Sequence, residues 1–187
     1  MSTIARLTLD EYDRLIERAV LLRDRRIELI HGELREKSPI GDPHRDAVNV
    51  LTNEWFAAQS TAAFRAAVTV QVQSPIRLPA LASSPHPDMS WIAKRAAGGA
   101  SNEADEVFLV IEVADTSLED DRGEKAELYA EAEIPEYWIV NIPERCVEVR
   151  RNPLSGHYRS VASYRAGDEI QPLLFPDCPL QVSLLFA

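Results

Sequence analysis

The sequence predicts a single α/β domain over residues 1–187, on three observations. The chain has 187 residues, 45% of them hydrophobic, which is enough to bury a sizeable core. Residues 107–114 and 136–141 are almost continuously apolar, as is typical of strands covered on both faces. A helix-like segment separates them, which favours a parallel crossover connection. No repeat, low-complexity stretch or long linker divides the chain.

The first third of the chain begins with a helix and a hairpin. Thr8 and Glu11 have the spacing of a capping box, which predicts a short helix to about Ala19. Residues 26–31 and 33–37 are strand-like on either side of a His-Gly pair, and this pattern predicts a tight hairpin.

The middle of the chain alternates helices and strands. Asp42 is placed to cap a helix over 43–59, with proline at its first position. Strands are expected over 64–72 and 89–93, and a second helix over 118–133. The remainder, 146–185, is expected to form short strands with turns at 152–153, 155–156 and 166–167.

The acidic residues are concentrated in one segment. The chain has 20 Lys+Arg and 30 Asp+Glu, a formal net charge of −10. Residues 103–136 carry 13 acidic and only two basic residues, so the rest is close to neutral. This acidity argues against a protein that coats nucleic acid by charge alone. A weak basic cluster is the only candidate phosphate-facing surface: Arg145, Arg150, Arg151, Arg159 and Arg165.

Composition also limits the compartment. No apolar run approaches the ~20 residues of a transmembrane helix, so no membrane partner is expected. The first residues meet charges too soon for a signal peptide. Cys146 and Cys178 lack a CxxC spacing and predict neither a disulfide framework nor a zinc site. A cytoplasmic location is expected.

Glu112 and Asp88 are the first candidates for chemistry. Glu112 interrupts the apolar run 107–114, where a carboxylate is costly unless it is paired, protonated or bound to a cation. The alternative is a carboxylate near the strand end that reaches solvent. Asp88 enters the strand 89–93. If the two strands are neighbours, two carboxylates and a backbone carbonyl would form a hard oxygen site for Mg²⁺ or Mn²⁺.

Lys125 is the next candidate. It shares a helix face with Leu128 and Tyr129, while nearby glutamates take another face. The chain has 17 Arg and only three Lys, which suggests that a compact charge is required here. Snorkelling at the helix edge is the alternative.

Three further residues are ambiguous. Glu28 lies in the first hairpin strand and belongs either to a site or to a solvated hairpin, and Glu33 has nearly the same claim. His44, in the first turn of the helix 43–59, shares the face that carries Val48 and could point towards the site. A lone histidine there is more often a structural hydrogen-bonding group.

An ordered series of segments resembles one known family. The segments are, in order, 8–12, 28–34, 38–39 with His44, 87–88, 111–113, 121–125 with Tyr129, and 135–140. Together they resemble the Uma-two family of restriction endonuclease domains, within the PD-(D/E)xK nuclease-like superfamily, and the match covers nearly the whole chain.

The resemblance implies a restriction-endonuclease-like mixed central β-sheet flanked by helices, with a metal site at one end. Asp88 and Glu112 match the family's metal ligands, and Mg²⁺ (or Mn²⁺) would also meet the carbonyl of Val113. The superfamily's usual lysine lies two residues after the glutamate, where this chain has Ala114. Lys125 matches a lysine that has moved to the following helix.

Other residues gain roles from the same resemblance. Glu28 matches an early glutamate that looks like an additional acidic ligand or water positioner. His44, Glu33 and Tyr129 are candidate auxiliary residues of the site.

The expected function is metal-dependent hydrolysis of phosphodiester bonds in nucleic acid, with DNA as the first expectation. The alternative is an inactive nuclease fold that serves as a binding or partner-interaction module, which the net charge of −10 favours. The resemblance further implies a homodimer if the protein cuts both strands of a duplex.

Overall fold

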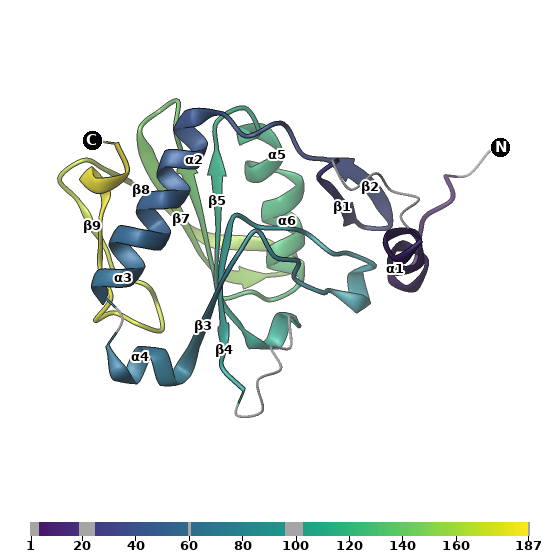
Figure 1. The fold of residues 1–187 in the computed structure, drawn as a ribbon, viewed down its shortest axis with the longest axis horizontal. Helices are drawn as coiled ribbons and strands as arrows, with labels where there is room; N and C mark the ends of the chain where they lie inside the picture. Colours follow the sequence, from purple (N-terminus) through teal and green to yellow (C-terminus); the bar gives the residue numbers. More distant parts are fainter. Residues whose placement is uncertain (1–3, 19–24, 60, 96–102, 187) are drawn as a thin grey trace.

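A six-stranded mixed β-sheet forms the centre of the computed structural model, which describes residues 4–18, 25–59, 61–95 and 103–186 (Figure 1). Strands β5 and β6 are parallel, and every other neighbouring pair in this sheet is antiparallel. The predicted mixed sheet and its parallel crossover are therefore confirmed. The strands, in spatial order, are β3 (Val68–Val72), β4 (Met89–Ala93), β5 (Val107–Ala114), β6 (Glu136–Asn141), β7 (Cys146–Leu154) and β8 (His157–Arg165).

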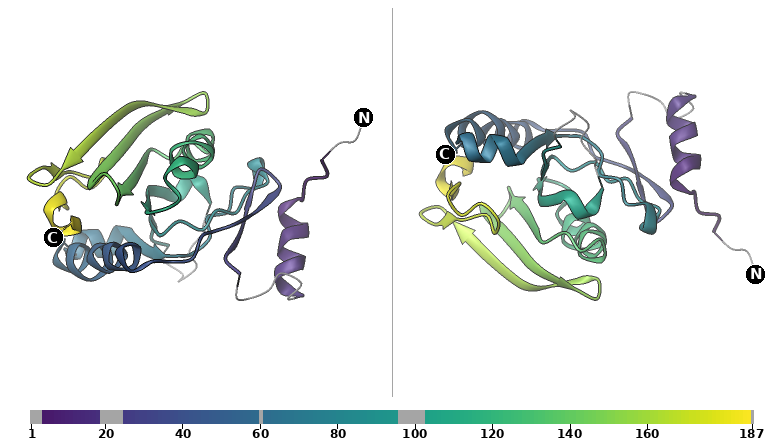
Figure 2. Two further views of the ribbon diagram at one scale, coloured as in Figure 1. Left: turned by 90° about the horizontal axis from the view of Figure 1, so that it is seen from above. Right: turned by 90° about the horizontal axis from the view of Figure 1, so that it is seen from below.

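Helices cover both faces of this sheet (Figure 2). Three tryptophans dominate the core on one face: the Trp55 ring stacks on Trp91 and Trp138, with centroids 4.9 and 5.5 Å apart. That face is covered by α2 (Asp42–Asn49), the π-helical turn η1 (Val50–Trp55), α3 (Phe56–Gln59), α4 (Ala62–Ala67) and the 3₁₀ segment η4 (Val182–Phe186). The other face packs against α5 (Leu118–Arg122) and α6 (Glu124–Glu131).

The predicted hairpin is a separate two-stranded sheet, at the right of Figure 1. Strands β1 (Ile27–Ile30) and β2 (Glu33–Glu36) pair with Ile30 opposite Glu33. The two turn residues between them have φ of 47° and 79°, as a type I′ turn requires. The helix α1 (Leu9–Glu17) packs on this hairpin, and its predicted capping box is present. Its predicted end at Ala19 lies outside the described residues.

The predicted strand over 64–72 is wrong in its first part. Residues 62–67 form α4, capped by the Thr61 side chain, and the strand begins only at Val68. An alanine-rich sequence favours the helix, and Phe64 anchors it with its ring 4.7 Å from Trp91.

Other local predictions also need correction. Gly41, not Asp42, is the N-cap of α2, while Asp42 lies in its first turn. The helix expected over 118–133 is broken at Gly123 into α5 and α6. The predicted turn at 152–153 is part of β7, whereas the turn at 155–156 joins β7 to β8. Four short elements complete the fold: η2 (Pro79–Leu81), η3 (Ala104–Glu106), β9 (Glu169–Ile170) and β10 (Leu180–Gln181).

Candidate active site

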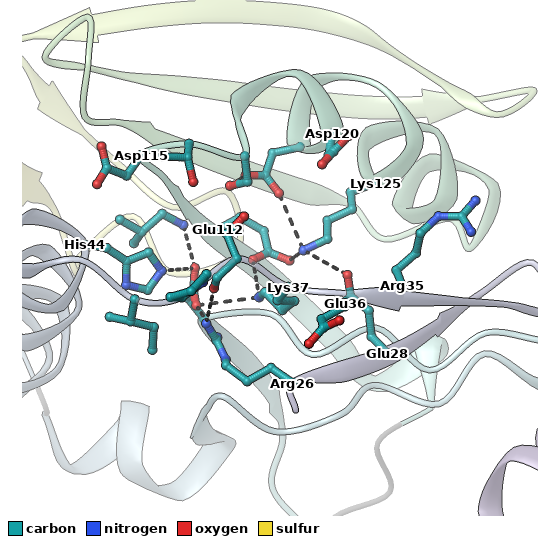
Figure 3. Close-up of a pocket in the computed structure, with 18 of the residues that line it drawn as sticks. Arg26, Glu28, Arg35, Glu36, Lys37, His44, Glu112, Asp115, Asp120 and Lys125 are labelled. Atoms are coloured by element: carbon teal, nitrogen blue, oxygen red, sulfur yellow. Dashed lines mark hydrogen bonds and ion pairs between the residues drawn. The ribbon is translucent and has the colours of Figure 1, made fainter. Parts of the chain in front are cut away.

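A pocket of about 130 Å³ lies where β4 and β5 meet the hairpin, α2 and the α5–α6 pair (Figure 3). The carboxylates of Glu28, Asp88 and Glu112 line it, together with Lys125 and His44. These residues are up to 97 positions apart in the sequence, from Glu28 to Lys125. The structure thus brings together all four residues that the sequence suggested as catalytic. Two of the three auxiliary candidates join them, since His44 lines the pocket and the Tyr129 hydroxyl contacts Glu112.

Glu112 is fully enclosed near the end of β5, with 1% of its surface exposed. Its Oε1 accepts hydrogen bonds from Lys125 Nζ at 2.8 Å and from the Tyr129 hydroxyl at 3.0 Å. Its Oε2 accepts a hydrogen bond from Lys37 Nζ at 3.3 Å. Burial raises the pKa of Glu112 above its usual 4.5, although both lysines oppose this shift. The solvent-reaching alternative for Glu112 is therefore wrong.

Asp88 lies beside Glu112 because β4 and β5 are antiparallel neighbours, with Met89 opposite Ile111. Its Oδ2 accepts the Val113 N–H at 2.9 Å and lies 3.0 Å from His44 Nε2. Burial opposes ionisation here, but the His44 contact and the Lys37 charge outweigh it and lower the pKa of Asp88.

The second oxygen of Asp88 is different. Oδ1 is buried and accepts no hydrogen bond from the described part of the chain. Two cations stand further off, with Lys37 Nζ at 3.7 Å and Arg26 Nη2 at 3.9 Å. A buried carboxylate oxygen without a donor calls for a compensating group.

Lys125 holds the centre of the acidic cluster. It is 5% exposed, and its Nζ lies 3.5 Å from both Glu28 Oε1 and Asp121 Oδ1, in addition to Glu112. Burial disfavours the ammonium form, but these carboxylates outweigh it and raise the pKa of Lys125 well above its usual value. Because Lys125 is enclosed, the alternative that its side chain snorkels to solvent at the helix edge is wrong.

Of the two remaining auxiliary candidates, Tyr129 contacts the site and Glu33 does not line it. Tyr129 contacts Glu112 from behind, and the Glu112 charge adds to burial in raising the tyrosine pKa. Glu33 is not among the residues that line the pocket. Its carboxylate pairs with Arg6 and Arg35, at 3.3 and 2.8 Å. The carbonyl of Val113 as a metal ligand stays a prediction.

Two further charged residues of the site, Lys37 and Asp121, were not predicted from the sequence. Lys37 follows the second hairpin strand, and its Nζ donates to the His86 carbonyl at 2.8 Å as well as to Glu112. The scarcity of lysine that drew attention to Lys125 applied equally to Lys37. Asp121 is buried four residues before Lys125, a spacing that could have indicated their pairing.

Two members of the predicted arginine cluster are ion-paired within the protein. Arg150 pairs with Glu148 and Arg151 with Glu136, at 2.9 and 2.6 Å. Arg165 donates to the Glu144 carbonyl at 2.9 Å. Two of the five positive charges are therefore paired with carboxylates of the same chain, which weakens the cluster as a phosphate-binding face.

Known proteins resemble this chain in both sequence and structure. Residues 9–183 match the family model described as "Uma2: Putative restriction endonuclease". The chain belongs to the Uma2 family. This match confirms the resemblance drawn from the ordered segments.

A solved structure shares the fold of this Uma2 protein. It is described as a putative nuclease belonging to DUF820 from Anabaena variabilis ATCC 29413. The two chains are 15% identical, the match covers 96% of this chain and 97% of that one, and the TM-score is 0.72. No curated protein matches the chain. Among the described residues, no helix combines the length and apolarity that a membrane crossing requires.

Proposed function

We propose that this Uma2 protein is a Mg²⁺-dependent (or Mn²⁺-dependent) nuclease that hydrolyses phosphodiester bonds of nucleic acid, with DNA as the first substrate to test. The observation that carries the proposal is the buried pair Asp88 and Glu112 on neighbouring strands, with Lys125 bonded to Glu112 at 2.8 Å. Enclosed carboxylates at a pocket are expensive to maintain, which favours a chemical role over a structural one.

The donor chemistry suits a hard divalent cation. Asp88 and Glu112 offer carboxylate oxygens, and Oδ1 of Asp88 accepts no hydrogen bond from any described residue. Among these residues no group of three His, Cys, Asp or Glu side chains forms a ready cage. Two carboxylates suffice for Mg²⁺, which usually keeps several water ligands and binds substrate phosphates. Asp88, Glu112 and the Val113 carbonyl would hold the ion.

A cation held there supplies Lewis-acid stabilisation of phosphoryl charge and activates water when bound. The protein's own groups provide orientation. His44 and the Val113 N–H fix Oδ2 of Asp88, while Tyr129 and Lys125 fix Oε1 of Glu112. Lys125 also supplies a positive charge beside the pocket, where negative charge on phosphoryl oxygens would develop. Glu28, whose Oε1 lies 3.5 Å from Lys125 Nζ, would position water.

Cleavage of plasmid DNA with Mg²⁺ or Mn²⁺ tests the proposal. Asp88→Asn, Glu112→Gln and Lys125→Met should each lower the cleavage rate at least ~100-fold, the scale expected for a lost catalytic group. Lys94→Met is the matched control, because Lys94 is exposed and donates only to the Arg65 carbonyl in the described structure. Full activity of Glu112→Gln would sink the proposal. Circular dichroism of each variant establishes that it folds.

A second candidate function is a nuclease fold retained for binding a partner without catalysis. The observation that favours it is that both oxygens of Glu112 already accept hydrogen bonds from lysines of the same chain. Titration calorimetry with Mn²⁺ separates the two. A non-catalytic scaffold should give no heat that depends on Asp88 and Glu112.

A further inference from the structure

Lys37 occupies the space between the two carboxylates of the proposed metal site. Its Nζ lies 3.3 Å from Glu112 Oε2 and 3.7 Å from Asp88 Oδ1. Figure 3 shows this ammonium group beside Glu112, on the side away from Lys125. The other two oxygens of the pair, Oε1 and Oδ2, are held by Lys125 and His44. Arg26 Nη2 also approaches Oδ1 of Asp88, at 3.9 Å, but it forms no ion pair with Glu112 and leaves Lys37 as the cation between the two carboxylates in the described structure.

We propose that the Lys37 ammonium is an internal competitor of the divalent cation: it neutralises Asp88 and Glu112 in the metal-free protein and must leave them when the ion binds. This inference rests on the proposed function only in assuming that Asp88 and Glu112 are the metal ligands. It adds a residue that sets the metal affinity of the site, and it reconciles a cation-dependent activity with a carboxylate pair that already contacts a lysine of the same chain.

Charge explains why the competitor is needed. Asp88 and Glu112 are 2% and 1% exposed, so two adjacent carboxylates would repel each other strongly if left alone. Lys125 compensates one oxygen of Glu112 but is shared with Glu28 and Asp121. Lys37 is the cation that reaches both Asp88 and Glu112.

Position explains why Lys37, rather than Lys125, is the group that moves. The side chain of Lys37 is 12% exposed and comes from the end of the hairpin, whereas Lys125 is enclosed on α6. Lys37 also holds the His86 carbonyl at 2.8 Å, a neutral partner outside the carboxylate pair. Mg²⁺ binds carboxylate oxygens at about 2.0–2.1 Å, and a second cation between the same oxygens would be strongly repelled.

The first test measures the affinity of the protein for Mn²⁺ by titration calorimetry, without nucleic acid. Lys37→Met should lower the Kd at least tenfold relative to the natural sequence, because the competing charge is gone. Lys94→Met is the matched control: it makes the same substitution at an exposed lysine outside the pocket and should leave the Kd unchanged. An unchanged or weaker affinity in Lys37→Met would overturn the inference.

The second test uses the natural sequence and therefore does not depend on the folding of a variant. Lysines are acylated with an amine-reactive ester in the presence of Mg²⁺ or EDTA, and the modified sites are quantified by mass spectrometry. Labelling of Lys37 should rise several-fold with Mg²⁺, whereas labelling of Lys94 should stay constant. Constant labelling of Lys37 at a Mg²⁺ concentration that saturates the site would overturn the inference.

The outcomes also separate this inference from the proposed function. Mn²⁺ binding that is equal in the natural sequence and in Lys37→Met would leave the metal site standing and reject the competitor. Binding that appears only in Lys37→Met would support the competitor and show that the natural protein keeps its metal site closed. Absence of binding in both, with both folded, would reject the competitor and the metal-dependent function together.

Discussion

Single residues in this pocket are held by ionic contacts whose loss should be costly. Lys125 meets the carboxylates of Glu112, Glu28 and Asp121 within 3.5 Å. Lys125→Met leaves buried negative charge without its main partner, which typically costs about 3–5 kcal/mol. Tyr129→Phe removes only one hydrogen bond to Glu112 and should cost about 1–2 kcal/mol. Urea unfolding at pH 7 in EDTA measures both, and equal losses would contradict this ranking.

The local sequence reveals some residues of the site but not others. Glu112 was identified because a carboxylate interrupts an apolar strand, a signal contained in eight residues. Lys37 carries no such signal, because it lies 75 positions from Glu112 and reaches it from a separate sheet. Its role depends on how the hairpin packs over the pocket, and that packing is a tertiary property.

At the scale of elements, the hairpin is the part that delivers Glu28 and Lys37 to the pocket. Its turn depends on Gly32, which has φ of +79° and contacts the segment before α1. A Cβ at this position would lie 2.7 Å from Arg6 Cβ and 2.9 Å from the Leu7 carbonyl oxygen. The turn therefore needs glycine for two separate reasons, conformation and space.

Gly32→Ala and Gly167→Ala separate these two reasons. Gly167 also has positive φ, at +102°, but a Cβ there meets nothing within 4 Å. Holding an alanine in a left-handed conformation costs about 1–2 kcal/mol, so both variants should lose about this much unfolding free energy. The overlap at Gly32 should add about 1–3 kcal/mol, and hydrogen exchange should quicken in β1 and β2. Equal unfolding free energies for the two variants would contradict the steric argument.

Some helices and strands were predicted from sequence patterns and others were not. The buried strands β5 and β6 were found at nearly their full length, because long apolar runs are strong signals. The residues 64–67 were assigned to a strand, yet they form a helix because Phe64 packs into the aromatic cluster. The break at Gly123 was also missed, since one glycine in a helical pattern is compatible with an unbroken helix.

For the whole molecule, the net charge of −10 has a more specific meaning than it had in the sequence alone. Part of it is buried: Glu112, Asp121 and Glu136 are each 1% exposed and lie inside the acidic segment. These carboxylates are matched by Lys125 and by arginines such as Arg151. The segment thus contributes internal ion pairs as well as surface charge.

The stability of the whole protein should depend on pH in a way that these buried acids determine. Burial raises the pKa of Asp121 above its usual 3.8, although Lys125 and Ser117 oppose the shift. A raised acid pKa penalises the folded state, and the penalty grows as pH rises from about 3.8 to the folded-state pKa. The contribution of Asp88 to stability has the opposite sign. Its lowered pKa stabilises the fold above about pH 3.8, and this stabilisation is lost as the pH falls from there towards the folded-state pKa.

Asp121→Asn isolates the first of these contributions. The unfolding free energy of the natural sequence in EDTA should decline between pH 4 and pH 7 relative to that of the variant. The titration of one group can change the unfolding free energy by at most about 1.4 kcal/mol per pH unit. Asp120→Asn is the matched control, because it makes the same substitution at the exposed neighbouring residue. If the unfolding free energies of Asp121→Asn and of the natural sequence changed in parallel with pH, Asp121 would have the same pKa in the folded and unfolded protein. That result would contradict a pKa raised by burial.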